Sequence, residues 1–313
     1  MSRLPRASVI LPRLLGGVLV VWVAVTLTFV SMQLMPGDMV DVIIGGPGGN
    51  NSPEARQAVI DQYGLDQSVA VQYLHYLASM FSGDFGTSHV FHQDVTSLLL
   101  DRIGPTLMLG AAALVLAWVL AVGLVMLTAG RGRIASSIGS GLEIFAVSTP
   151  QLWLGMVLLL VFSFQLGWFP IAGGSGIGSL VLPTVAMAVP LAGYLGQVSR
   201  EATEHALEQP FVLTARARGM SDLGVRFRHV LRHAALPGVT LSGFAVGWLF
   251  SGAVVVESLF GRPGLGSTLL AGVQGRDAAL TGAIVVVSAV LYVVANLVVD
   301  LLYPLIDPRI RVR

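Results

Sequence analysis

The chain has 313 residues, of which 54% are hydrophobic and only 11% are charged, and its mean hydropathy is +0.79. This composition is too apolar for an ordinary soluble domain and predicts a protein that lies in lipid. The formal net charge of +1 gives no reason to expect a nucleic-acid partner. The absence of Cys excludes disulfides, thiolate metal sites and Cys nucleophiles.

Long runs without charge or His predict transmembrane helices, since a helix needs about 20 apolar residues to cross a bilayer. These runs are 14–37, 103–130, 144–199, 234–256 and 278–299. The third run is too long for one helix, and it contains GWFPIAGGSGIG at 167–178, whose Gly and Pro residues break helices. We therefore predict two helices in this run and six transmembrane helices in an all-α membrane protein.

The positions of the basic residues, all of which are Arg, predict the orientation of these helices. In the six-helix arrangement only Arg56, Arg102, Arg262 and Arg276 lie on the side opposite the N-terminus. Because cytoplasmic segments carry an excess of Lys and Arg, we expect both termini in the cytoplasm. We expect the first helix to be retained, because its apolar run is longer than that of a signal peptide and no cleavage site of small residues follows it.

The segment between the first two predicted spans, residues 36–103, is acidic and is expected to form short helices outside the cell. SPE at 52–54 fits the N-cap and first turn of a helix, and Gly64 fits its C-terminal cap. Asp66 is expected to cap a second helix, and DVTSLLLDRIG at 94–104 is expected to begin a third that leads into the second span. Composition favours a folded cap over the mouth of the protein, with a docking surface for an extracellular partner as the alternative.

No catalytic or metal-binding pattern is evident in the sequence. GRPGLG at 261–266 is rich in Gly, but a Walker A loop requires a Lys that reaches the nucleotide phosphates, and the chain has no Lys. The His residues lack the spacing of HExxH or of His/Cys ligand sets. His89 and His92 could touch a metal, although surface His pairs at this spacing are common. We therefore expect a chain with no enzymatic activity, no cofactor and no metal of its own.

Two acidic residues lie in or beside predicted spans, Glu143 near the start of the third and Glu257 near the outer end of the fifth. Burying an acid in a membrane costs several kcal/mol, so both are candidates for a pathway or a gate. Both also lie close enough to an interface to be solvated or paired. Ion coupling would place acids or His nearer the midplane, so we favour a transport pathway without ion coupling over a secondary transporter.

The long connection at 200–237, on the expected cytoplasmic side, is rich in Arg. REATEHALEQP is expected to be an acidic helical piece that stops near Pro210. Ser221 or Asp222 is expected to cap a second piece, in which apolar residues alternate with Arg and His. A topology signal lying on anionic headgroups is the simpler interpretation. Two helical pieces joined near Gly219, however, indicate a folded loop, and a folded loop implies a partner.

Short motifs along nearly the whole chain point to one family. They are LMPGD, LDQSVAVQYLHYL, GDFGTS, STPQLWLG, LGWFP, TARARG with a downstream LP, PGLG, and NLVVDLLYPLIDPRIR. In these motifs the chain resembles the permease subunits of ABC importers, most closely the dipeptide, oligopeptide and nickel branch. It departs from the general loop pattern E-A-A-x-x-x-G, because the E-A-A positions hold Leu213, Thr214 and Ala215 and only the last Ala and Gly219 are kept.

The resemblance implies a type I ABC importer permease fold. Residues 1–35 would form the N-terminal tail and first helix, 36–93 an extracellular helical insertion, 94–306 the permease core and 307–313 a cytoplasmic tail. The chain would form half of a translocation pathway for dipeptides or oligopeptides, with nickel, glutathione or another small solute as alternatives. Its partners would be a second permease, two ABC ATPases that bind ATP and Mg²⁺, and an extracellular substrate-binding protein.

The resemblance also implies that the loop carries a helix that couples the permease to an ATPase. The expected contact residues are Ala215, Arg216, Ala217, Arg218, Gly219, Met220, Ser221, Asp222 and Leu223. Gly219 and the cap that follows it are expected to matter most. Replacing Arg226 is expected to have a smaller effect, because an exposed ion pair contributes only about 0–1 kcal/mol.

Overall fold

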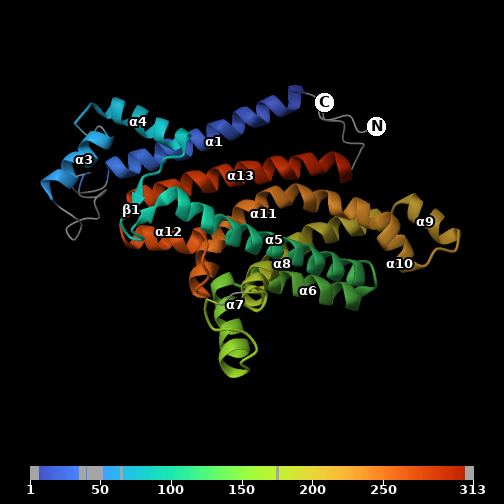
Figure 1. The fold of residues 1–313 in the computed structure, drawn as a ribbon. Coiled ribbons are helices and arrows are strands. Elements are labelled where there is room, and N and C mark those ends of the chain that lie inside the picture. The colour runs from blue at the N-terminus through green and yellow to red at the C-terminus, as the bar shows by residue number, and fades with distance from the viewer. Residues whose placement is uncertain (1–6, 35–39, 41–51, 64–65, 174–175, 307–313) are drawn as a thin grey trace. The chain divides into compact units, whose positions relative to one another are not determined.

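The structure is a computed structural model that describes residues 7–34, 40, 52–63, 66–173 and 176–306, and it is mostly helical (Figure 1). Contacts divide the chain into two compact units. The first comprises the residues up to Thr106 together with Pro263–Val294, and the second comprises Leu107–Arg262 together with the residues from Ala295 onward. Helices α5 (Val95–Thr128) and α13 (Ala278–Ile306) each contribute to both units.

The first unit combines transmembrane helices with most of the predicted insertion. Besides parts of α5 and α13, it contains α1 (Ala7–Gln33), α3 (Pro53–Tyr63), α4 (Val69–Ser82), the antiparallel pair β1 (Thr87–Ser88) and β2 (Gln93–Asp94), and α12 (Leu265–Gln274). Its core is formed where the start of α5 packs against α12 and α13, through Leu98, Leu265, Leu280 and Ile284. Burial of these side chains joins segments that lie far apart in the sequence.

Helix α4 of the insertion packs against α1. The Thr26 and Tyr73 hydroxyls are 2.7 Å apart, and Gln33 donates to Gln72 at 2.8 Å. The Phe29 ring meets the Tyr73 ring edge-on, with 5.3 Å between their centroids. The insertion is therefore folded onto the first transmembrane helix.

The predicted helix boundaries of the insertion are confirmed in part. Helix α3 begins at Pro53, as expected. Helix α5 begins directly after Asp94, whose carboxylate accepts from the Ser97 amide at 2.8 Å, and it runs unbroken into the second span. The prediction for Asp66 was wrong, because the N-cap of α4 is Ser68, the extended residue directly before the first helical turn. Gly64 lies outside the described residues.

The second unit surrounds α8 (Gly178–Leu207), which packs against α6 (Arg133–Ser148), α7 (Gln151–Leu158) and α11 (Leu231–Leu259). Four shorter pieces join these helices: the π-helical segments η2 (Leu159–Gln165) and η3 (Arg226–Val230), and the short helices α9 (Pro210–Ala217) and α10 (Asp222–Val225). Small residues bring α6 and α8 together, since a Cβ on Gly193 would lie 2.6 Å from the Glu143 carbonyl oxygen.

The described residues contain five helices long and apolar enough to cross a membrane. The sixth predicted span is the pair α6 and α7–η2, which is bent by 95° and counts as one span only if its two parts are taken together. The bend lies at Thr149 and Pro150, both of which are extended, and a residue before Pro is disfavoured in the helical region. The predicted break at 167–178 is confirmed, because η2 ends at Gln165 and α8 begins at Gly178.

The orientation of the spans gives a testable prediction. The chain contains no Cys, so a single introduced Cys can be labelled without background. A membrane-impermeant maleimide added to intact cells should label Glu54→Cys on α3, which is exposed, and should label Arg228→Cys on the exposed face of η3 only after the membrane is opened. Equal labelling of both sites in intact cells would contradict the predicted orientation.

Candidate functional site

The segment between α8 and α11, residues 208–230, is named here the basic loop. Helix α8 continues through most of REATEHALEQP to Leu207, so the acidic piece is the end of a transmembrane helix and not a separate helix. The predicted break near Pro210 is confirmed, with Pro210 in the first turn of α9. This position suits Pro, whose missing amide proton has no intrahelical acceptor there.

The basic loop has a small hydrophobic core of its own. Val212 and Ala215 of α9 pack with Val225 and Val230 of the following helical pieces and with Ala206 of α8. A segment that only marks topology does not need a core. The prediction that this segment is folded is therefore confirmed.

A Schellman motif ends α9 and turns the chain into α10. The Gly219 amide donates to the Arg216 carbonyl at 2.9 Å, and the Met220 amide donates to the Ala215 carbonyl at 3.2 Å. Gly219 has a φ of +83°, in the left-handed region that this motif requires and that Gly adopts without strain. Met220 packs back onto the core of the loop, as is typical of the residue after such a turn.

Ser221 is the N-cap of α10. It is extended, and its hydroxyl accepts from the Gly224 amide at 3.2 Å, which satisfies a donor of the first turn. Asp222 is the first residue of the helix and has a different role. Of the two predicted caps, Ser221 is therefore the one that the structure has.

The Asp222 carboxylate lies among three Arg residues. Its Oδ1 accepts from Arg216 Nη2 at 2.9 Å and its Oδ2 accepts from Arg226 Nε at 2.7 Å, while Arg131 Nη2 lies 3.5 Å from Oδ2. Partial burial raises the pKa of Asp222, but the hydrogen bonds and charges of Arg226 and Arg216 outweigh it, so the pKa lies below its ordinary value. The carboxylate therefore stays ionised at neutral pH.

The expectation that Arg226 is exposed was wrong. Its side chain is only 1% exposed, and its Nη1 donates to the Ala129 carbonyl at 2.7 Å and to the Met126 carbonyl at 3.4 Å. Met126 lies in the last turn of α5 and Ala129 directly follows the helix, where terminal carbonyls lack partners within the helix. A hydrogen bond from a charged donor contributes about 1.5–3 kcal/mol, more than the exposed pair assumed from the sequence.

The predicted contact residues divide into an inner and an outer set. Ala215 is buried and Met220 packs inward, whereas Arg216, Ala217, Arg218, Gly219, Ser221 and Leu223 are exposed. Two exposed apolar residues were missed, Leu213 with 73% of its surface exposed and Phe227 with 52%. Leu213 and Ala215 are two positions apart in α9 and therefore lie on opposite sides of the helix. Because Ala215 faces the core, the helical period would have predicted an exposed Leu213.

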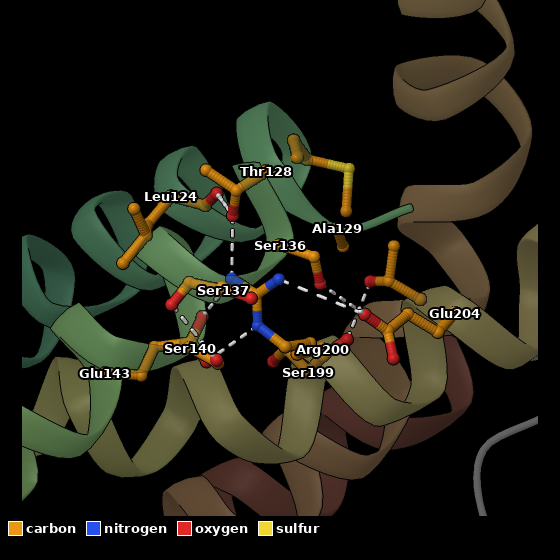
Figure 2. A network of polar contacts seen from close by, with 12 residues as sticks. Leu124, Thr128, Ala129, Ser136, Ser137, Ser140, Glu143, Ser199, Arg200 and Glu204 are labelled. Carbon is orange, nitrogen blue, oxygen red and sulfur yellow. Dashed lines mark hydrogen bonds and ion pairs between the residues drawn. The ribbon is translucent and has the colours of Figure 1, made fainter. Parts of the chain in front are cut away.

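Glu143 of α6 forms a buried ion pair with Arg200 of α8 (Figure 2). The two Glu143 carboxylate oxygens accept from Arg200 Nε and Nη2, both at 2.8 Å, and Nη2 also donates to Thr128 Oγ1 of α5 at 2.7 Å. Glu204, one turn further along α8, lies 4.0 Å from Arg200 Nη1. The pair joins three transmembrane helices, so Glu143 is paired, one of the outcomes expected from the sequence.

Glycines make room for this pair. A Cβ on Gly139 would overlap Thr128 and Arg200, and a Cβ on Gly196 would lie 3.0 Å from the Glu143 side chain. Glu257, in α11, is 1% exposed, and its charge acts on Arg262. A pathway or gate role for either acid stays a prediction.

A cavity of about 160 Å³ lies between α6, α8 and α11. Its lining is aromatic and aliphatic, from Val147, Pro190, Leu191, Tyr194, Phe244, Ala245 and Trp248. Neither Glu143 nor Glu257 lines it. The second unit thus has an apolar recess within its transmembrane helices, separate from both acids.

The predicted histidine pair is placed on the insertion. His89 Nε2 lies 3.0 Å from the Gly275 carbonyl, and the neighbouring Asp277 accepts from the Ser88 hydroxyl at 2.6 Å. His92 has a φ of +52°. Among the described residues no group of three or more His, Asp or Glu is placed to hold a metal ion. His89 therefore helps to attach the β1–β2 hairpin to the connection between α12 and α13.

Comparisons with known proteins assign the family. Residues 113–312 match the family model of the binding-protein-dependent transport system inner membrane component, and residues 7–110 match the N-terminal model of the same family. The chain is 35% identical to the glutathione transport system permease protein GsiC of Salmonella typhimurium and 33% identical to that of Escherichia coli K12. Both alignments cover 96% of this chain and 98% of the relative.

The solved structure of the MetNI methionine ABC transporter is similar in fold, with a TM-score of 0.54 and 19% identity, and the match covers 67% of this chain and 96% of that one. At this identity the likeness shows the fold alone, which is that of type I ABC importer permeases. The two family models cover nearly all of the chain. The chain therefore belongs to the binding-protein-dependent transport system inner membrane components, and it is a multi-pass inner-membrane permease subunit of an ABC importer.

Proposed function

We propose that this permease carries short peptides across the inner membrane, with glutathione as the first substrate to test, and that ATPases docked on the basic loop drive the transport. The substrate class is supported by relatives named as glutathione permeases, at 33–35% identity over nearly the full chain. Glutathione is a tripeptide, so it falls within the peptide class that the sequence motifs imply. Because the chain belongs to a family of binding-protein-dependent transport components, we no longer consider the secondary transporter that the sequence left as an alternative.

One observation carries the docking part of the proposal. The basic loop, which is folded on a core of its own, holds an exposed surface that combines apolar and basic side chains, Leu213, Arg218, Leu223 and Phe227. Exposed apolar side chains on a folded frame are typical of surfaces that bind protein partners. We assign this surface to one of two cytoplasmic ATPases, in a complex that also contains a second permease and an extracellular substrate-binding protein.

Purified alone, the chain should neither bind nor hydrolyse ATP, because it has no Lys to complete a phosphate loop. Purified from cells that express the whole transporter, it should retain its ATPase subunits. Retention should fall when Leu223→Asp and Phe227→Asp place charges on the exposed surface, while Ile134→Asp, an exposed change on α6, serves as the control. Stoichiometric ATP binding by the isolated chain, or full retention in the double variant, would contradict the docking proposal.

Uptake into proteoliposomes identifies the substrate. The complete transporter with its binding protein should accumulate radiolabelled glutathione only when ATP is supplied to the ATPase side, and unlabelled dipeptides should compete if the site accepts peptides generally. Uptake of Ni²⁺ without uptake of glutathione or dipeptides would assign the nickel alternative. Uptake that persists without ATP would contradict the proposal itself.

The insertion is proposed as part of the surface that receives the substrate-binding protein. Deleting residues 53–80 should weaken docking of the binding protein in a pull-down. The milder change Asp61→Arg, at an exposed position on α3, leaves the packing of α4 on α1 in place. It should weaken docking as well if the acidic surface itself makes the contact. Unchanged affinity after the deletion would leave the insertion as a cap over the mouth.

A further inference from the structure

Arg226 joins the basic loop to a helix that is remote from it in sequence. The basic loop continues directly into α8 at one end and α11 at the other, so any movement of the loop reaches those two helices through the chain itself. Helix α5 has no such connection: Ala129 and Met126 lie 97 and 100 residues from Arg226. The Arg226 guanidinium bridges this separation.

The two ends of the guanidinium have different partners. Nε donates to Asp222 in the first turn of α10, and Nη1 donates to the terminal carbonyls of α5. The positive charge also lies at the C-terminal end of α5, where the helix dipole favours a cation. The planar guanidinium fixes the angle between these bonds, whereas a Lys ammonium is a point charge that cannot reproduce the fork.

Surrounding contacts reinforce this connection. Arg131, in the turn after α5, approaches the same Asp222 carboxylate at 3.5 Å. A Cβ on Gly130, in that turn, would lie 2.8 Å from Leu207 at the end of α8, so the turn packs closely against the start of the basic loop. Leu231 adds an apolar contact to the end of α5. Of these contacts, the hydrogen bonds from Arg226 to the Ala129 and Met126 carbonyls are both buried and directional.

We infer that Arg226 is a positioning residue for coupling, which makes the end of α5 move together with the basic loop. This inference rests on the proposed function of the loop as the ATPase docking surface. Docking itself uses the exposed side chains of the basic loop, whereas the Arg226 side chain is only 1% exposed and is not among them. Loss of Arg226 should therefore separate two properties, leaving the ATPase bound while its movement no longer reaches α5.

The test uses the complete transporter and two introduced cysteines, Leu127→Cys on the exposed face of the last turn of α5 and Gln209→Cys, at an exposed position of the basic loop outside the docking surface. Nitroxide labels on these sites report the distance between loop and helix by electron paramagnetic resonance, with and without ATP and vanadate. The variants are Arg226→Lys and Arg226→Met, and Arg228→Lys is the matched control at an exposed position of the same segment.

In the parent and in Arg228→Lys, the distance distribution should stay narrow in both nucleotide states. In both Arg226 variants it should broaden when ATP and vanadate are added, and glutathione transport per ATP hydrolysed should fall about tenfold, within the range of mutations that modulate coupling. ATPase retained per permease should stay near the parent value. Unchanged distance distributions and transport in Arg226→Lys would overturn the inference.

Other outcomes are equally informative. If retained ATPase, thermal stability and transport fall in parallel in both variants, Arg226 serves only to fold the loop, and the inference is wrong. If the parent complex itself retains no ATPase, the proposed docking function fails first, and the inference fails with it. The parent complex retains its ATPase in the first case and not in the second, so the two failures are distinguishable.

Discussion

Glu143→Ala is expected to destabilise the permease by about 3–5 kcal/mol, because it leaves Arg200 as a buried charge without its partner. The Arg200 side chain is 8% exposed and that of Glu143 is 1% exposed, so water cannot replace the lost carboxylate in the folded chain. The change should appear as a large drop in the thermal unfolding temperature of the purified chain in detergent, and as a lower yield of folded protein from membranes.

The matched control removes both charges together. Replacing a buried ion pair by apolar residues of similar size is often neutral or stabilising, so Glu143→Leu combined with Arg200→Met should recover most of the lost stability. Glu204→Gln should have little effect, because Glu204 is 45% exposed and lies 4.0 Å from the guanidinium. Equal instability of the single and double variants would contradict the ion-pair explanation.

The same variants test whether Glu143 acts in the pathway. If its only role is to hold α6 against α8, the stable double variant should transport at close to the parent rate. If the double variant is stable but transports poorly, the charge itself is needed, and the pathway or gate role predicted from the sequence gains support. Stability and transport must therefore be measured on the same preparations.

Most of the transmembrane helices could be predicted from the sequence, because hydropathy over about 20 residues reports directly on the length of chain that crosses a bilayer. The third span could not be placed correctly by this means. Pro150 bends it, and its first half, α6, begins at Arg133 in a segment with several polar residues. A helix that packs Glu143 and Gly139 against a neighbour does not need a uniformly apolar surface.

The basic loop shows which features of a site depend only on residues that are close in the sequence. Gly219 and Ser221 were identified because a left-handed C-cap and a Ser N-cap depend on residues within a few positions of each other. Arg226 was misplaced because its acceptors come from α5, about a hundred residues earlier, and nothing near Arg226 in the sequence indicates them. Arg200 was missed as the partner of Glu143 for the same reason.

Gly219→Glu is expected to lower both ATPase retention and transport while leaving membrane insertion and the arrangement of the spans unchanged. A left-handed conformation costs about 1–2 kcal/mol for a residue other than Gly. The structure attributes this cost to φ alone, since a Cβ at Gly219 would meet nothing within 4 Å. A cost of this size shifts the folding equilibrium of a marginal segment by about 5–30-fold. The added carboxylate also stands beside the exposed Arg and Leu residues proposed to contact the ATPase.

Two further replacements at Gly219 separate backbone strain from charge. Asn tolerates the left-handed region better than other residues, so Gly219→Asn should retain most of the bound ATPase and most of the transport. Gly219→Val adds no charge but cannot adopt a positive φ without strain, so it should resemble Gly219→Glu if the Schellman motif is what docking requires. Measured as ATPase retained per permease, the expected order is Gly, Asn, Val, then Glu. Full ATPase retention and full transport in Gly219→Glu would mean that the basic loop does not dock the ATPase. If Gly219→Glu loses ATPase and Gly219→Val does not, the effect belongs to charge at the contact surface.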